Sequence, residues 1–212
     1  MQHGQQQRRL HWARALRGRG ATPISVSWIS IAFAALAGLM FYIGLSAPAR
    51  EGAMPLLLAV LGLQGQLWCN RMDGVLARQA RMVSRAGEVY NDAPDRLSDV
   101  AVCVGLGYGL QAGLPWAAQL GWAAALCCVA TAGVRMLGLA CGTAEPRQGP
   151  MSRVQRMQWL SLAGALALPL QWMGQPRLAA WVLIGALTVL IAGALLTVAV
   201  RLRTIVRTLE HR

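Results

Sequence analysis

Acidic side chains are rare in this chain of 212 residues, which holds 8 Asp and Glu residues in total. Five of the carboxylates lie between positions 73 and 99: Asp73, Glu88, Asp92, Asp95 and Asp99. At about 100° per residue, the last four fall within a roughly 60° arc of a helix, with Asn91 at its edge. Carboxylates on one stripe repel each other unless positive charge lies against them. This stretch therefore predicts either a divalent cation site or an ion-pair network with nearby arginines.

Three arginines elsewhere in the chain could bind an anion. Arg135 lies within an apolar run, where a buried guanidinium needs a partner. Arg153 and Arg156 are three residues apart, so on a helix they face the same way and could bind a phosphate together. Two alternatives stay open: Arg153 and Arg156 could serve only to orient the chain in a membrane, and Arg135 could extend to the interface.

The elements that carry these side chains are predicted to be membrane spans. The chain is 56% hydrophobic and 13% charged, whereas soluble domains carry about 25% charged residues. Six apolar runs are long enough to cross a bilayer as helices, at approximately 25–46, 53–70, 94–112, 115–141, 158–173 and 178–200. The expected fold class is an all-α, polytopic membrane protein. One six-span domain over 21–200 would be flanked by basic segments at 1–20 and 201–212.

The formal charge of +12 follows the loops between these runs. Sixteen of the 20 basic residues, all arginines, lie in the two tails and in the second and fourth loops, whereas the other side has only Arg50 and Arg177. Under the positive-inside rule both termini are cytoplasmic, and a nucleic-acid partner is not expected. Residues 1–20 are predicted to form an amphipathic interfacial helix or, alternatively, a disordered basic tail.

A motif from Asn70 to Asp99, NRMDGVLARQARMVSRAGEVYNDAPDRLSD, resembles the signature of the CDP-alcohol phosphatidyltransferases. That signature is D-x-x-D-G-x-x-A-R, then about eight residues, then G-x-x-x-D-x-x-x-D. The matching positions here are Asp73, Gly74, Ala77, Arg78, Gly87 and Asp95. Asn70 and Asn91 stand where the family has aspartates.

The resemblance implies an enzyme of phospholipid biosynthesis in a bacterial-type inner membrane, commonly a homodimer. Such an enzyme transfers the phosphatidyl group of CDP-diacylglycerol to an alcohol and releases CMP. Two Mg²⁺ or Mn²⁺ ions would be held at Asn70, Asp73, Asn91 and Asp95, with Asp92 as a substitute ligand. Asp95 would also be the general base for the incoming hydroxyl.

The resemblance assigns further roles around these ligands. The CDP moiety would be bound by Gly74, Ala77, Arg78 and Gly87. The acceptor's phosphate would be bound by Arg135, Arg153 and Arg156. Glycerol 3-phosphate is therefore the first acceptor to test.

The two asparagines leave other functions open. An amide oxygen can ligate a hard cation but adds no charge, so we expect weaker metal binding than four aspartates would give. A weakened or inactive homologue that acts as a membrane scaffold is one alternative. A small transporter is another, although the chain shows no internal repeat and its acids cluster at one membrane edge instead of the midplane.

Overall fold

Six α-helices account for nearly all of the described chain. The computed structural model describes residues 22–48, 50–79, 85–146 and 148–210, and its side-chain description excludes residues 23, 73–74, 76–79 and 85–91. The helices are α2 (Pro23–Ser46), α3 (Ala53–Gln79), α4 (Arg85–Gln111), α5 (Ala117–Ala140), α6 (Arg153–Trp172) and α7 (Pro176–Glu210). The prediction of an all-α fold with six long helices is confirmed.

Local signals in the sequence set several helix ends. Thr22 caps α2, since its side chain accepts a hydrogen bond from the Ser25 amide at 3.1 Å while the Ser25 hydroxyl accepts one from the Thr22 amide at 3.0 Å. At the start of α6, the Ser152 amide donates to Gln155 Oε1 at 2.8 Å. The chain leaves α6 through Gly174, whose φ of 76° is a left-handed conformation that favours glycine.

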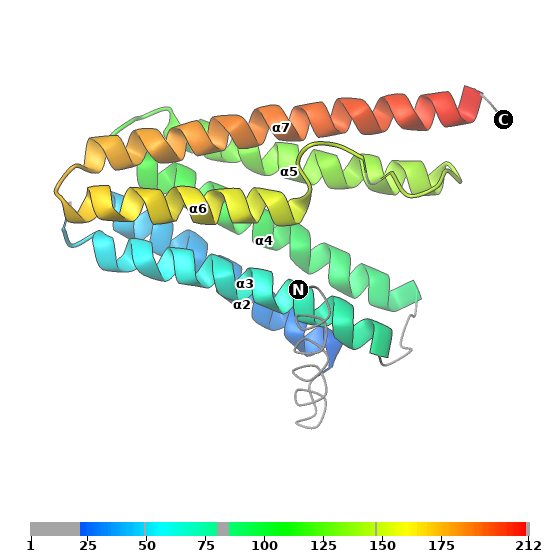
Figure 1. Cartoon of the computed structure of the whole chain (residues 1–212), viewed down its shortest axis with the longest axis horizontal. Coiled ribbons are helices and arrows are strands. Elements are labelled where there is room, and N and C mark those ends of the chain that lie inside the picture. Colours follow the sequence, from blue (N-terminus) through cyan, green and yellow to red (C-terminus); the bar gives the residue numbers. More distant parts are fainter. Residues whose placement is uncertain (1–21, 49, 80–84, 147, 211–212) are drawn as a thin grey trace, which may run out of the picture.

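The helices run alternately up and down, so that α2, α4 and α6 end where α3, α5 and α7 begin (Figure 1). Neighbouring helices form a closed ring: α2 packs on α3 and α4, α4 on α5, α5 on α7, α7 on α6, and α6 on α3. As a result α3 and α4, which carry the motif, flank α2 without packing closely against each other. On its other side α4 packs against α5.

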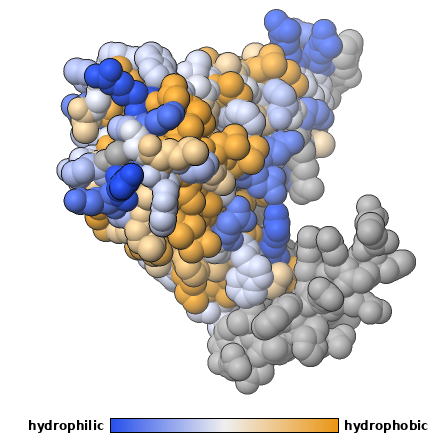
Figure 2. Space-filling model, turned by 60° about the vertical axis from the view of Figure 1, so that its left-hand side comes forward, coloured by the Kyte–Doolittle hydropathy of each residue, from blue (hydrophilic) through white to orange (hydrophobic). Residues whose placement is uncertain are grey.

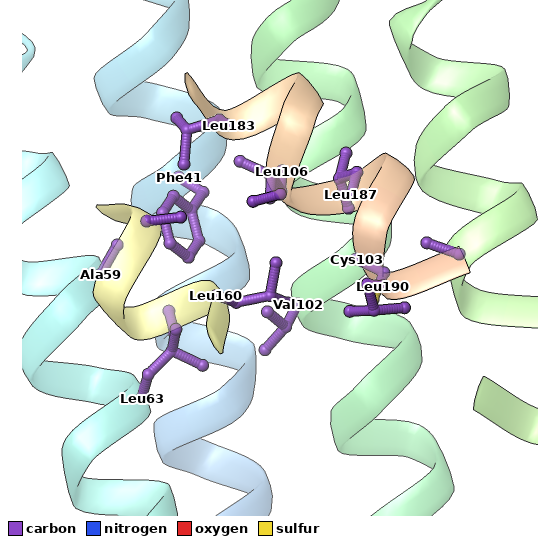
Figure 3. Packing of buried hydrophobic residues seen from close by; sticks show 14 of the residues in the cluster. Phe41, Ala59, Leu63, Val102, Cys103, Leu106, Leu160, Leu183, Leu187 and Leu190 are labelled. Atoms are coloured by element: carbon purple, nitrogen blue, oxygen red, sulfur yellow. The ribbon is translucent and has the colours of Figure 1, made fainter. Parts of the chain in front are cut away.

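The centre of the ring is filled by aliphatic and aromatic side chains (Figure 3). Phe41 of α2, Leu160 of α6 and Leu183 of α7 are fully buried there. Leu106 of α4 and Leu187 of α7 lie beside them. This core holds the ends of α4, α5, α6 and α7 in fixed relative positions, which positions the polar side chains at one end of the bundle.

Glycines let α2 and α4 approach closely. A Cβ atom on Gly105 would lie 2.3 Å from the Gly38 carbonyl oxygen, and a Cβ on Gly38 would lie 2.3 Å from the Ala101 carbonyl oxygen. These contacts are with backbone, which cannot move aside as a flexible side chain can. Small residues at such positions are typical of helix packing in membranes.

We expect Gly105→Ala to destabilise the bundle by about 1–3 kcal/mol, because the added methyl group overpacks the α2–α4 contact. The measurement is the thermal unfolding midpoint in detergent. Gly185→Ala is the matched control, since a Cβ there meets no atom within 4 Å and alanine favours helix. Equal midpoints for the two variants would contradict the proposed close packing.

Three of the described helices are long and apolar enough to cross a membrane by themselves: Ile24–Ser46, Ala117–Ala140 and Pro176–Glu210. The other three, α3, α4 and α6, extend beyond the predicted spans at 53–70, 94–112 and 158–173 and carry polar side chains, such as Gln64 and Gln66 on α3 and Arg153 on α6. The six-span prediction is therefore supported for all six helices as elements and for three by apolar length. Figure 2 shows a broad hydrophobic area on one face, with hydrophilic residues beside it.

The predicted flanking segments have different outcomes. The interfacial helix expected at 1–20 lies outside the described residues. Residues 201–210, expected as part of a basic tail, continue α7 as regular helix. Arg201 and Ile205 are buried on this extension, so the last part of the chain contributes to the bundle.

Candidate functional site

A cavity of about 330 Å³ opens at the end of the bundle where α5 ends and α6 begins. Five arginines line it: Arg96 of α4, Arg135 of α5, Arg153 and Arg156 of α6, and Arg201 of α7. Glu145 is the one carboxylate in the described lining. We call this space the arginine-lined cavity.

One side of the cavity is held together by Asp92 and Arg135. Asp92 forms ion pairs with Arg96, one helical turn away, and with Arg135 Nη2 at 3.0 Å. The other guanidinium nitrogen of Arg135, Nη1, lies 3.1 Å from Glu145 Oε1 in the segment between α5 and α6. This chain of charges fixes the α5–α6 connection against α4. Arg135 therefore has the carboxylate partners that a guanidinium in an apolar run needs.

The other side is built by Arg153 and Arg156 from the first turn of α6. Arg153 Nη1 donates to Asp95 Oδ1 at 2.7 Å, and Arg153 Nε donates to Asp99 Oδ1 at 3.0 Å. Arg156 Nη2 donates to the other oxygen of Asp99 at 3.1 Å. The Arg156–Asp99 pair is almost completely buried, with side-chain exposures of 4% and 2%. A buried pair of this kind needs further hydrogen bonds, and Arg156 Nη1 supplies one to Thr131 Oγ1 at 3.0 Å.

Arg201 completes the wall from α7. Its Nη1 donates to the Thr131 carbonyl at 2.7 Å and its Nε to the Gln148 carbonyl at 3.0 Å. Its exposure is only 8%. Among the described residues, no carboxylate lies within ion-pair distance of this guanidinium. Arg201 therefore brings a positive charge that its hydrogen bonds to backbone carbonyls do not neutralise.

The charges around the cavity do not balance. Five arginines are matched by four described carboxylates, and the three aspartates lie behind the arginines instead of lining the cavity. Three of the guanidinium groups also keep a buried N–H group with no hydrogen-bond partner: Arg135 Nε, Arg153 Nη2 and Arg156 Nε. Unpaired buried donors are costly. The cavity is thus suited to an anionic ligand with several acceptor oxygens.

The motif residues of α3 are described only in part. The Asn70 side chain lies across from α2, where its Oδ1 accepts a hydrogen bond from the Ser30 hydroxyl at 3.1 Å. One helical turn earlier, Gln66 is fully buried and neither of its amide atoms has a partner. Six of the residues predicted to bind metal or CDP lie outside the part of the chain with described side chains: Asp73, Gly74, Ala77, Arg78, Gly87 and Asn91. In the part of the chain with described side chains, no group of three or more His, Cys, Asp or Glu residues could hold a metal ion.

The structure brings together the three arginines singled out from the sequence and the α4 carboxylates. For Asp92, Asp95 and Asp99 the arginine network, one of the two expectations for this stripe, is what the described residues show. Whether Arg135, Arg153 and Arg156 bind phosphate stays a prediction.

Arg201 was missed by the sequence reasoning, which placed it in a tail. A signal was available, because Leu190, Ala194, Thr197, Arg201 and Ile205 continue one buried stripe of α7 at helical spacing.

Comparison with known proteins identifies the family of the chain. Residues 22–202 match the CDP-alcohol phosphatidyltransferase family. No curated protein matches the chain.

Solved structures with the same fold include the phosphatidylinositol phosphate synthase PgsA1 of Mycobacterium tuberculosis. Its structure with CDP-DAG bound is 20% identical, with a TM-score of 0.70, and the match covers 93% of this chain and 92% of that one. The structure of PgsA1 in complex with manganese and citrate is 21% identical, with a TM-score of 0.68, and the match covers 91% and 86%. At this level of identity the likeness establishes the fold.

Proposed function

The chain belongs to the CDP-alcohol phosphatidyltransferase family, and we propose that it transfers the phosphatidyl group of CDP-diacylglycerol to a phosphorylated alcohol with release of CMP. In this reaction the acceptor's hydroxyl oxygen bonds to the phosphorus that carries the diacylglycerol. The bond from that phosphorus to the oxygen bridging it to CMP breaks, and CMP leaves. The hydroxyl proton passes to a base on the protein.

The choice of a phosphorylated acceptor rests on the excess of arginine in the arginine-lined cavity. Arg156 and Arg201 both hydrogen-bond to Thr131, so their guanidinium groups are close together. Guanidinium groups recognise phosphate through charge-assisted hydrogen bonds. The unmatched charge of Arg201 favours a dianionic phosphate over a neutral alcohol. Glycerol 3-phosphate stays the first candidate, and an inositol phosphate is the second because the solved relative is a phosphatidylinositol phosphate synthase.

Asp95 is well placed to serve as the general base in this proposal. Its carboxylate lies 2.7 Å from Arg153, one of the cavity's arginines. Asp95 does not itself line the cavity, so the proposal requires the hydroxyl of an acceptor bound by the arginines to reach this carboxylate past the Arg153 side chain. A base must lie within hydrogen-bond reach of the proton that it removes. Asp92, by contrast, is held by Arg96 and Arg135 on the other side of the cavity.

A divalent cation fits the chemistry of the proposed donor set. Asn70, Asp73, Asn91 and Asp95 each carry a side-chain oxygen that can act as a ligand, and Mg²⁺ and Mn²⁺ prefer oxygen ligands. Asn70 Oδ1 accepts one hydrogen bond from Ser30, and an amide oxygen has a second lone pair for a cation. Bound there, the cation would offset the negative charge of the pyrophosphate.

CMP release from CDP-diacylglycerol, with Mg²⁺ or Mn²⁺, tests the proposed function. The acceptors are compared in pairs: glycerol 3-phosphate against glycerol, and inositol phosphate against inositol. We expect the phosphorylated member of one pair to react on the order of 100-fold faster, since a hydrogen bond to a charged group contributes about 1.5–3 kcal/mol. Equal rates within both pairs would overturn the choice of acceptor. No CMP with any acceptor would favour the scaffold or the transporter.

Asn91→Asp should tighten the binding of Mn²⁺ on the order of tenfold, because it adds a unit negative charge to a carboxylate-poor site. Titration followed by the electron paramagnetic resonance of free Mn²⁺ measures this. Gln175→Glu introduces the same charge in the connection between α6 and α7, at the other end of the bundle, and should leave the affinity unchanged. If both variants bind Mn²⁺ like the parent protein, Asn91 is not a ligand position.

A further inference from the structure

A second cavity lies at the opposite end of the bundle from the arginine-lined cavity. It has a volume of about 430 Å³ and lies where α2, α4 and α6 end and α7 begins. Its wall is largely apolar and includes Leu45, Leu110, Leu114 and Trp181. We call it the distal cavity. Nothing in the proposed reaction uses it, because the motif and the clustered arginines lie at the other end.

Two polar side chains interrupt this apolar wall. Arg177 lies in the first turn of α7, and no described residue forms an ion pair with it. The N-terminal end of a helix already favours an anion, so a positive side chain there strengthens the attraction. The positive-inside rule disfavours arginines in the loops at this end of the bundle. Only Arg50 and Arg177 occur in those loops.

The second polar group is Gln171 near the end of α6. It is only 1% exposed, and its Nε2 donates to the Gly44 carbonyl at 3.2 Å. Its Oε1 is buried with no hydrogen-bond partner. A buried carbonyl oxygen without a donor is costly in an apolar setting. Since Gln171 also lines the distal cavity, a ligand there that carries a hydroxyl group could supply the missing donor.

We propose that the distal cavity binds an anionic diacyl phospholipid with a hydroxylated headgroup. An acyl chain packs against Leu45, Leu110 and Leu114, the phosphate pairs with Arg177, and a headgroup hydroxyl donates to Gln171 Oε1. The apolar wall explains why the ligand is a lipid and not a free phosphate. The absence of carboxylates from the described lining explains why it is anionic. This inference is independent of the proposed reaction.

Native mass spectrometry of the protein extracted from vesicles of equal parts phosphatidylglycerol and phosphatidylcholine tests the proposal. We expect preferential retention of phosphatidylglycerol, and a loss of that preference by about tenfold in Arg177→Gln, which removes one charge-assisted contact. Arg50→Gln is the matched control: it removes the other arginine of this side, which does not line the distal cavity, and should retain lipid normally. Both variants should keep the parent rate of CMP release.

A second variant separates a filled cavity from a general loss of fold. A Cβ on Gly113 meets no atom within 4 Å, so Gly113→Leu should fold and place its side chain at the distal cavity. We expect it to retain fewer copies of both lipids. Unchanged phosphatidylglycerol in Arg177→Gln, displacement of the lipid by millimolar inorganic phosphate, or occupation of this face by a second copy of the chain would each overturn the proposal.

Discussion

Asp95→Asn should lower the rate of CMP release by about 10²–10⁴-fold, the usual contribution of a general base. The substitution keeps the size of the side chain while removing the carboxylate that would accept the hydroxyl proton. The fold should survive, because Arg153 keeps its 3.0 Å hydrogen bond to Asp99. Initial rates in lipid nanodiscs, with the unfolding midpoint measured on the same samples, give the result.

Asp92→Asn is the matched control for this prediction. Asp92 lies on the same face of α4 and also pairs with arginines, so both variants lose one carboxylate from an ion-pair network. We expect the control to retain at least about a tenth of the parent rate, since the loss concerns a structural contact. The reverse order of effects would show that Asp92 and not Asp95 serves the reaction.

Arg156→Met should destabilise the protein by about 3 kcal/mol or more, because removing one partner of a buried ion pair leaves the other charge uncompensated. Asp99 would keep only its bond to Arg153, at 1% residue exposure. The thermal unfolding midpoint in detergent should fall by several degrees. Arg207→Met is the control. Arg207 is exposed near the C-terminal end of α7, so this variant should unfold like the parent protein.

A double variant distinguishes the structural role of Arg156 from its proposed role in binding phosphate. Asp99→Asn/Arg156→Met removes both charges, so much of the lost stability should return. The KM for the phosphorylated acceptor should stay raised, because the cavity still lacks one guanidinium group. If stability and KM recover together, Arg156 serves only the fold.

The helices were predictable because their signal is local. Each predicted span lies largely within one observed helix, since apolar length and capping residues act over a few turns. The ends were less accurate, and α7 illustrates why. Apolar composition predicts where a helix meets the membrane, whereas backbone hydrogen bonding continues α7 to Glu210.

The site was predictable only where residues close in sequence share a helix face. Spacing alone identified the stripe of Asp92, Asp95 and Asp99 and the pair on α6. It could not pair Asp99 with Arg156, which are 57 positions apart, because such a contact depends on how the helices pack.

Arg201 was missed for the same reason. Its hydrogen bond to Thr131 joins positions 70 residues apart and exists only because α5 packs against α7. The predicted ligands on α3 stay predictions.

The most direct test of the account is an experimental structure of the protein with Mn²⁺ and CDP-diacylglycerol, with the ions located by anomalous scattering. We expect Mn²⁺ to be coordinated by Asp73 of α3 and Asp95 of α4, against the pyrophosphate, with the arginine-lined cavity open beside it. A structure with the nucleotide bound elsewhere, or with Asp95 still paired to Arg153 and no ion between α3 and α4, would contradict it.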